Sequence, residues 1–176
     1  MRDQFLQVVQ KKLAVSAIGP SALRGQGGKG VVGAARDYCK ALNLGKLASF
    51  KRELTFVEYL DRATEELTHS SKYLRWGAAR KALNLFLRDA LYNIYLNKAF
   101  KLDRVESWLE IPLDSVVAKG LRAMAERGEL PAWPGLKQLI PEISNKYQEF
   151  ATRQADKRDI SRVHLDMYLW LPGRNP

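Results

Sequence analysis

Apolar residues recur every three to four positions along most of the chain, and no run alternates with the two-residue period of a β-strand. The first spacing lines one face of an α-helix, whereas the second lines one face of a strand. The pattern contains no internal repeat and no low-complexity stretch. We therefore predict an all-α fold, either as a single compact domain over residues 1–176 or as two small lobes around a cleft.

Start and stop signals set the helices in the first third of the chain. Residues 5–18 keep one apolar face, and the Gly-Pro pair that follows ends this helix. A second helix is expected over about residues 31–42. A third begins with Thr55 and Glu58, which have the spacing of a capping box.

The clearest helical pattern lies in the middle of the chain. An apolar stripe from Ala79 to Tyr95 predicts one long amphipathic helix. A second and more polar face of this helix carries Lys81, Asn84, Arg88 and Tyr92.

Helical signals continue to the end of the chain. Asp114 has the position of an N-cap for a helix that Gly128 closes. A proline opens the helix expected over residues 141–157. The last segment, 160–171, fits a helix capped by Ser161 better than a strand.

The charge balance favours a polyanionic partner. The 176 residues include 29 Lys and Arg against 19 Asp and Glu, a net charge of +10. Each phosphate that a basic protein neutralises releases counterions and adds affinity that does not depend on sequence. A basic surface without a nucleic-acid partner is the alternative interpretation.

Several classes of site and location are disfavoured by the composition. The single cysteine, Cys39, excludes a disulfide framework and a multi-cysteine metal site, and His69 and His164 are too few for a histidine-rich one. We expect no metal and no cofactor. The chain opens without a hydrophobic leader and has no apolar run near the roughly 20 residues of a membrane span. We expect a cytoplasmic monomer with no membrane partner, associated with the nucleoid if prokaryotic.

A glycine-rich segment occupies residues 24–30. It contains the spacing Gly-x-Gly-x-x-Gly, but a helix and a turn precede it, so the strand of a dinucleotide-binding motif is missing. Its free backbone amides, with Arg24 and Lys29, can hold a phosphate. A plain connector between two helices is the alternative.

Two residues have the chemistry of an amine nucleophile and its acid–base partner. Lys81 lies near the predicted start of a helix, where the helix dipole favours the neutral amine that a nucleophile needs. Asp114 follows Ile111 and Pro112, 33 residues further on. The structural alternative is a solvated lysine on a polar helix face and an aspartate that only caps a helix.

The residues around this pair carry a family resemblance. The segment from Trp76 through Lys81 to Tyr92, followed by Ile-Pro-Leu-Asp114, resembles the helix-hairpin-helix superfamily of DNA glycosylases. In lyase members of that superfamily a lysine opens the helix after the hairpin, and a Pro-Val-Asp-type motif supplies a catalytic aspartate. Here the usual hairpin sequence is reduced to Gly77.

The nearest resemblance is to the archaeal-type 8-oxoguanine DNA glycosylases. Those proteins carry an acid and a tryptophan four residues apart near the C-terminus, and Asp166 and Trp170 look like that pair. The resemblance spans roughly residues 75–171. It implies an enzyme that removes an oxidised purine from DNA and also cleaves the strand as an AP lyase.

The resemblance also implies residue roles. Lys81 attacks the sugar carbon and forms an imine, Asp114 handles the proton and the developing charge, and Asp166 accepts a hydrogen bond from the extruded base. The expected base-binding residues are Asp166, Trp170, Phe86 and Trp76. The expected contacts to the DNA backbone are Arg24, Lys29, Arg75, Arg80, Lys119 and Arg122.

Two other functions remain open from the sequence. One is a non-catalytic, basic helical module that binds DNA or RNA. The other is a glycosylase fold used for another modified base. An amine, a carboxylate and an acid–tryptophan pair in register favour the enzyme, because a binding module does not need all four together.

Overall fold

A computed structural model describes the protein over residues 1–26 and 30–170, and every regular element within those residues is a helix. The predicted all-α fold is confirmed. The elements, in chain order, are α1 (Arg2–Ala17), α2 (Val31–Ala41), the 3-10 helix η1 (Leu44–Ser49), α3 (Glu53–His69), α4 (Trp76–Tyr92), α5 (Ile94–Phe100), η2 (Leu102–Trp108), α6 (Ser115–Met124), η3 (Leu136–Gln138), α7 (Pro141–Asp156) and α8 (Arg162–Leu169).

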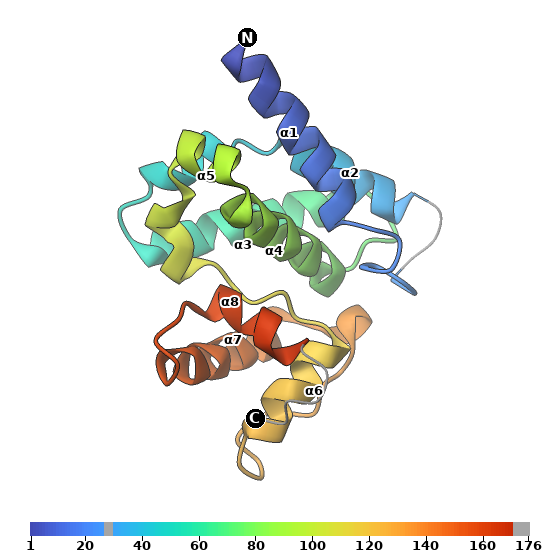
Figure 1. Cartoon of the computed structure of the whole chain (residues 1–176). Helices are drawn as coiled ribbons and strands as arrows, with labels where there is room; N and C mark the ends of the chain where they lie inside the picture. Colours follow the sequence, from blue (N-terminus) through green and yellow to red (C-terminus); the bar gives the residue numbers. More distant parts are fainter. Residues whose placement is uncertain (27–29, 171–176) are drawn as a thin grey trace.

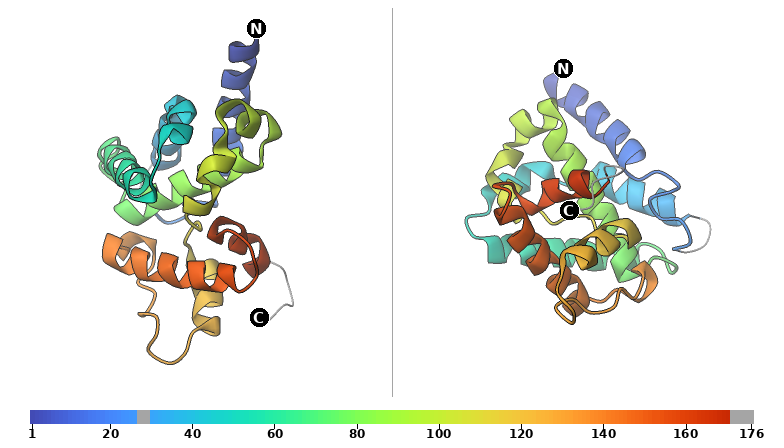
Figure 2. Two further views of the ribbon diagram at one scale, coloured as in Figure 1. Left: turned by 90° about the vertical axis from the view of Figure 1, so that its left-hand side faces the viewer. Right: turned by 60° about the horizontal axis from the view of Figure 1, so that its bottom comes forward.

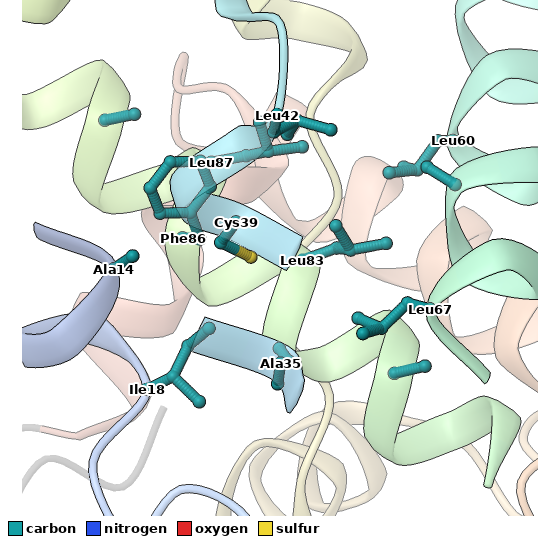
Figure 3. Close-up of a cluster of buried hydrophobic side chains, with 14 of the residues drawn as sticks. Ala14, Ile18, Ala35, Cys39, Leu42, Leu60, Leu67, Leu83, Phe86 and Leu87 are labelled. Carbon is teal, nitrogen blue, oxygen red and sulfur yellow. The ribbon is translucent and has the colours of Figure 1, made fainter. Parts of the chain in front are cut away.

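The helices enclose two clusters of buried apolar side chains. The first lies mainly in the N-terminal half, residues 2–109, and also includes Val163 of α8; in it, side chains of α1 to α4 meet around Cys39 (Figure 3). The second belongs to the C-terminal half, residues 111–169, and is formed mainly by α6, α7 and α8. Figures 1 and 2 show these halves as two groups of helices, one above the other.

Gly77 allows α4 to pack closely on the C-terminal half. A Cβ at this position would lie 2.4 Å from the carbonyl oxygen of Leu136 and 2.7 Å from Cβ of Leu139. Both distances are shorter than non-bonded contacts allow, so only glycine fits this contact of α4 with η3. Trp76, beside it, is half-buried against the second cluster.

Polar contacts fix α8 to the N-terminal half. The Arg162 guanidinium donates to the carbonyls of Leu109 (3.0 Å) and Trp108 (2.8 Å). His164 lies between the Glu106 carboxylate, 2.9 Å from Nε2, and the Tyr92 hydroxyl, 2.9 Å from Nδ1. These contacts decide where α8 lies relative to α4.

The long helix predicted from Ala79 to Tyr95 is wrong at its C-terminal end. α4 stops at Tyr92, and Asn93 caps α5 by accepting hydrogen bonds from the amides of Tyr95 and Leu96, both at 3.1 Å. A local side-chain acceptor thus restarts the helix in a new direction. Consequently Tyr95 is exposed rather than buried.

Three predicted caps behave differently in the structure. α3 begins two residues before Thr55, whose hydroxyl donates to the carbonyl of Arg52, so no capping box forms. α6 ends at Met124, and Gly128 serves a later turn with a φ of +87°. Ser161 does occupy the N-cap of α8, but its hydroxyl donates to Glu106 instead.

Candidate functional site

A pocket of about 430 Å³ lies between the two halves of the molecule. The end of α1, the loop after it and α4 line one side, while the Pro112–Asp114 segment and α8 line the other. Four of its lining side chains are charged, and they form two neighbouring acid–base pairs: Lys81 with Asp114, and Arg88 with Asp166. The lining residues are Ala17, Ser21, Ala22, Lys81, Leu85, Arg88, Pro112, Asp114, Asp166, Met167 and Trp170.

Lys81 and Asp114 meet in this pocket. The Nζ of Lys81 lies 3.1 Å from Oδ2 of Asp114 and donates a hydrogen bond of 2.9 Å to the carbonyl of Ala22. Only 8% of Lys81 is exposed, so the solvated lysine of the structural alternative is wrong. The lysine does not open its helix either, since α4 begins at Trp76. It is positioned by burial and by two acceptors.

Asp114 uses its two carboxylate oxygens for different purposes. Oδ1 caps α6 by accepting from the amides of Val116 (2.9 Å) and Val117 (3.0 Å), which confirms the predicted cap. Oδ2 is left to face Lys81. The extended backbone at Asp114, with φ −149° and ψ −173°, lets one side chain reach both partners. A simple cap therefore does not describe this residue.

Asp166 lies deeper in the pocket and is only 2% exposed. Its Oδ2 accepts a hydrogen bond from Nη1 of Arg88, and Nε of the same guanidinium donates to Asp89. Oδ1 has no hydrogen-bond partner among the residues that the structure describes. Burial raises the pKa of Asp166 because it disfavours the charged carboxylate, although Arg88 acts in the opposite direction.

Trp170 lies one helical turn after Asp166, at the end of α8. Its backbone amide donates to the carbonyl of Asp166 at 3.2 Å, and the residue is 56% exposed. Both residues line the same pocket, the acid inside it and the indole at its rim. This placement agrees with the prediction from the sequence that the two side chains share one site.

Two of the predicted base-binding aromatics are not in the pocket. Phe86 is fully buried in the first apolar cluster, among the residues drawn in Figure 3. Trp76 packs on the second cluster, with the Arg80 guanidinium 5.6 Å from its ring centroid. The assignment of Phe86 is wrong, because its ring is enclosed in the first cluster and leaves no face for a base. Trp76 is half-buried and does not line this pocket, and its predicted role stays a prediction.

Arg80 is not available to the DNA backbone. It is 3% exposed and ion-pairs with Glu110 at 2.7 Å and with Asp61 at 2.8 Å. Burial alone would lower the pKa of this guanidinium, but the two carboxylates hold it above its ordinary value. This arginine serves the fold, and its predicted role is wrong.

The other predicted backbone contacts remain on the surface. Arg24 lies two residues after Ala22, and Lys119 and Arg122 lie on the helix that Asp114 caps; these three and Arg75 are exposed. Lys29 lies outside the described residues. Positive charge thus lies on the chain segments on either side of the Lys81–Asp114 pair.

The glycine-rich segment follows a helix and a series of turns, as expected, so the strand of a dinucleotide motif is missing there. Gly25 and Gly30 have φ values of +72° and +98°, which favour glycine. Gly30 is the N-cap of α2. In the described residues these glycines serve the turn between α1 and α2.

Sequence analysis assigned no role to Arg88 and Leu85, which line the pocket beside Lys81. Residues 81, 85 and 88 are spaced by four and by seven, which places them on one face of a helix. From that spacing, the shared position of these side chains could have been predicted. No sequence pattern indicates the carbonyl of Ala22, because it lies 59 positions from Lys81 along the chain.

The rest of the described chain adds two observations. Within residues 1–26 and 30–170, no group of three or more His, Cys, Asp or Glu side chains is placed to hold a metal ion. In the same residues, no helix is both long enough and apolar enough to cross a bilayer.

Comparisons with known proteins give no family: no protein-family model, no curated protein and no solved structure matches this chain. The resemblance to DNA glycosylases therefore stays a prediction from the motifs.

Proposed function

We propose that this protein is a DNA base-excision enzyme that removes an oxidised purine and then cleaves the strand as an AP lyase. The observation that carries the proposal is the 3.1 Å approach of Lys81 Nζ to Asp114 Oδ2 inside a pocket. An amine with an adjacent carboxylate, largely shielded from water, is what imine-forming catalysis requires. A surface ion pair would offer neither the shielding nor the cavity.

The pocket suits an extruded base. Its volume of about 430 Å³ falls within the range of small-molecule sites, roughly 300–1,000 Å³. Enzymes that act on a base inside a duplex rotate it out of the stack and hold it by stacking and by hydrogen bonds to its edge. Trp170 offers a face for stacking, and Oδ1 of Asp166 offers a free acceptor.

The chemistry follows from the two acid–base groups. After a proton of the Lys81 amine passes to Asp114, the Nζ lone pair forms a bond to the anomeric carbon. The glycosidic C–N bond breaks, its electron pair leaves with the base, and Asp114 passes to the base the proton that it took from Lys81. The C1′–O4′ bond then breaks as a proton moves from Nζ to O4′, which gives a cationic imine between the sugar and Lys81.

Strand cleavage uses the same imine. Loss of a proton from C2′ forms a carbon–carbon double bond and expels the 3′ phosphate. The negative charge of Asp114 stabilises the cationic imine while it lasts. Arg24, Lys119 and Arg122 lie on segments next to the pocket and can bind phosphates of the damaged strand.

Borohydride trapping tests the proposal. Reduction of the imine should leave the protein covalently attached to an oligonucleotide that contains 8-oxoguanine or a preformed abasic site. Lys81→Gln should abolish this product, yet retain most DNA affinity because it removes one cation of many. The matched control is Lys98→Gln, an exposed lysine on α5 that does not line the pocket.

Two results would overturn the proposal. Undiminished trapping in a folded Lys81→Gln variant would place the nucleophile elsewhere. DNA binding by the wild type without any trapping would favour the non-catalytic binding module.

A further inference from the structure

Three large apolar side chains gather on the surface where the first turns of α1 meet α5. Phe5 and Tyr95 pack edge to face with their ring centroids 5.2 Å apart, and Ile94 precedes Tyr95 in the chain. Phe5 is nevertheless 47% exposed, and Ile94 and Tyr95 are each 58% exposed. All three residues line one hollow of about 310 Å³. Exposed apolar residues that cluster in this way mark interaction sites more often than singly exposed ones do.

Four cations adjoin this apolar group. Arg2 and Lys98 line the same hollow, and Lys98 also lines a second hollow of about 520 Å³ together with Lys101 and Arg104. All four are exposed, and none forms an ion pair with another described residue. Among the described residues that line either hollow, Asp103 is the one carboxylate. We name the three apolar side chains and the four cations together the α1–α5 surface.

We propose that the α1–α5 surface binds an acidic peptide segment of a partner protein. Apolar side chains of that segment pack on Phe5, Ile94 and Tyr95, and its carboxylates face the four cations. Charge complementarity selects an acidic partner and speeds its encounter with a protein of net charge +10. Aromatic side chains that become buried supply much of the affinity of such interfaces, and charged side chains surround them.

A nucleic acid and a second copy of this chain fit the surface less well. Successive bases stack on aromatic faces that lie roughly parallel, whereas the planes of Phe5 and Tyr95 are inclined at 84°. Ile94 has no aromatic face, and its branched side chain suits contact with other apolar side chains. A second copy would bring the same four cations against the first set, and like charges across an interface oppose association.

The α1–α5 surface lies away from the pocket of Lys81 and Asp114. Phe5 and Ala17 line the two different hollows at opposite ends of α1, roughly 18 Å apart at the helical rise of about 1.5 Å per residue. Figures 1 and 2 show the N-terminal end of α1 extending beyond the other helices. A partner bound there leaves the pocket open. The inference therefore does not depend on the proposed function.

Peptide selection tests the proposal. Random peptides of about 16 residues, roughly 24 Å long as a helix, are displayed on phage and selected against the immobilised full chain. Enriched peptides are then synthesised with a fluorophore, and their affinity for the protein is measured by anisotropy. They should be acidic and contain aromatic or large aliphatic residues. Their affinity should fall as salt is added, because salt screens exposed charges.

Surface variants locate the binding site. Tyr95→Ser removes an apolar contact, and Lys98→Glu reverses one charge; each should weaken peptide binding on the order of tenfold. Both positions are exposed, so both variants should fold, which a thermal melt checks. The matched controls are Tyr73→Ser and Lys146→Glu, which make the same changes at exposed positions outside both hollows and should leave the affinity unchanged.

Several results would overturn the proposal. A selection that enriches no acidic peptide would reject the partner chemistry. Acidic peptides that bind Tyr95→Ser and Lys98→Glu as tightly as wild type would place the binding site elsewhere. A single-stranded oligonucleotide that loses as much affinity as the peptide in Tyr95→Ser would make this surface a nucleic-acid interface. A wild-type dimer that Tyr95→Ser dissociates, seen by sedimentation velocity, would assign the surface to a second copy.

One further measurement separates this inference from the proposed function. Cleavage at a preformed abasic site should proceed at the wild-type rate in Tyr95→Ser, and Lys81→Gln should bind the enriched peptides as wild type does. Loss of peptide binding in Lys81→Gln would place the peptide in the pocket and reject the α1–α5 surface as its site. Absence of cleavage by the wild type would reject the proposed function and leave this inference standing.

Discussion

Replacement of Asp114 by asparagine separates the two tasks of this side chain. Oδ1 accepts hydrogen bonds from the amides of Val116 and Val117, and Oδ2 faces Lys81 Nζ at 3.1 Å. Asparagine retains a capping oxygen but places an uncharged amide beside the lysine. We therefore expect Asp114→Asn to fold and to lose base-excision activity.

The stability change can be estimated from the contacts. Asparagine caps a helix about as well as aspartate, whereas alanine costs about 1 kcal/mol at such a position. Loss of the charged acceptor leaves the Lys81 ammonium with the carbonyl of Ala22, at a cost on the order of 1–3 kcal/mol. At about 2–4 °C per kcal/mol for a chain of this size, Asp114→Asn should melt about 2–12 °C lower, and Asp114→Ala a further 2–4 °C or so.

Activity and stability are measured on the same samples. Loss of a general acid–base group lowers a rate by typically 10²–10⁴-fold, so single-turnover excision of 8-oxoguanine should fall by about that factor in Asp114→Asn. Asp37→Asn is the control, since Asp37 is exposed and, among the described residues, forms an ion pair only with Lys40. A lowered melting temperature together with near wild-type excision would refute the reasoning and leave Asp114 as a structural cap.

Three further predictions address the fold, its pH dependence and the base pocket. Gly77→Ala should lower the free energy of unfolding by more than the roughly 1–3 kcal/mol typical of overpacking, because the added Cβ would clash with the Leu136 backbone. A melting temperature equal to that of the wild type would contradict this packing. Burial disfavours the charged form of Glu110, yet the Arg80 guanidinium outweighs burial and lowers the pKa of Glu110, so the stabilisation from this carboxylate should be complete above pH 4.5, its ordinary value, and be lost as the pH falls further. Glu110→Gln should therefore flatten the acid limb of a plot of melting temperature against pH. An unchanged acid limb would assign the acid sensitivity to other carboxylates. Trp170→Ala should slow excision of 8-oxoguanine, because stacking worth about 1–3 kcal/mol is lost, while cleavage at an abasic site should change much less. Equal losses on both substrates would contradict the proposed contact with the base.

Local sequence signals determined most of the secondary structure. Periodic apolar positions gave the helices, and Asp114 was recognisable as a cap because an N-cap needs only amides two and three residues away. The exceptions were also local. Asn93 broke the predicted long helix, since its side-chain oxygen accepts hydrogen bonds from the amides two and three residues later and so competes with helix continuation.

The candidate site was predictable only in part. Lys81, Asp114, Asp166 and Trp170 were singled out by residue type and by the motif resemblance, and all four line the pocket. Roles that depended on exposure were not predictable. Arg80 and Phe86 have the residue types of a DNA-binding cleft, yet both are buried.

Tertiary structure decided which polar groups became partners. Arg80 is neutralised by Glu110, 30 positions away, and the partner of Arg88 in the pocket, Asp166, lies 78 positions away. Such pairings depend on how α4, the segment before α6 and α8 pack, and this packing is set by the summed burial of two apolar clusters. A sequence specifies which side chains can form ion pairs or line a pocket, but burial, which follows from long-range packing, decides which of them do.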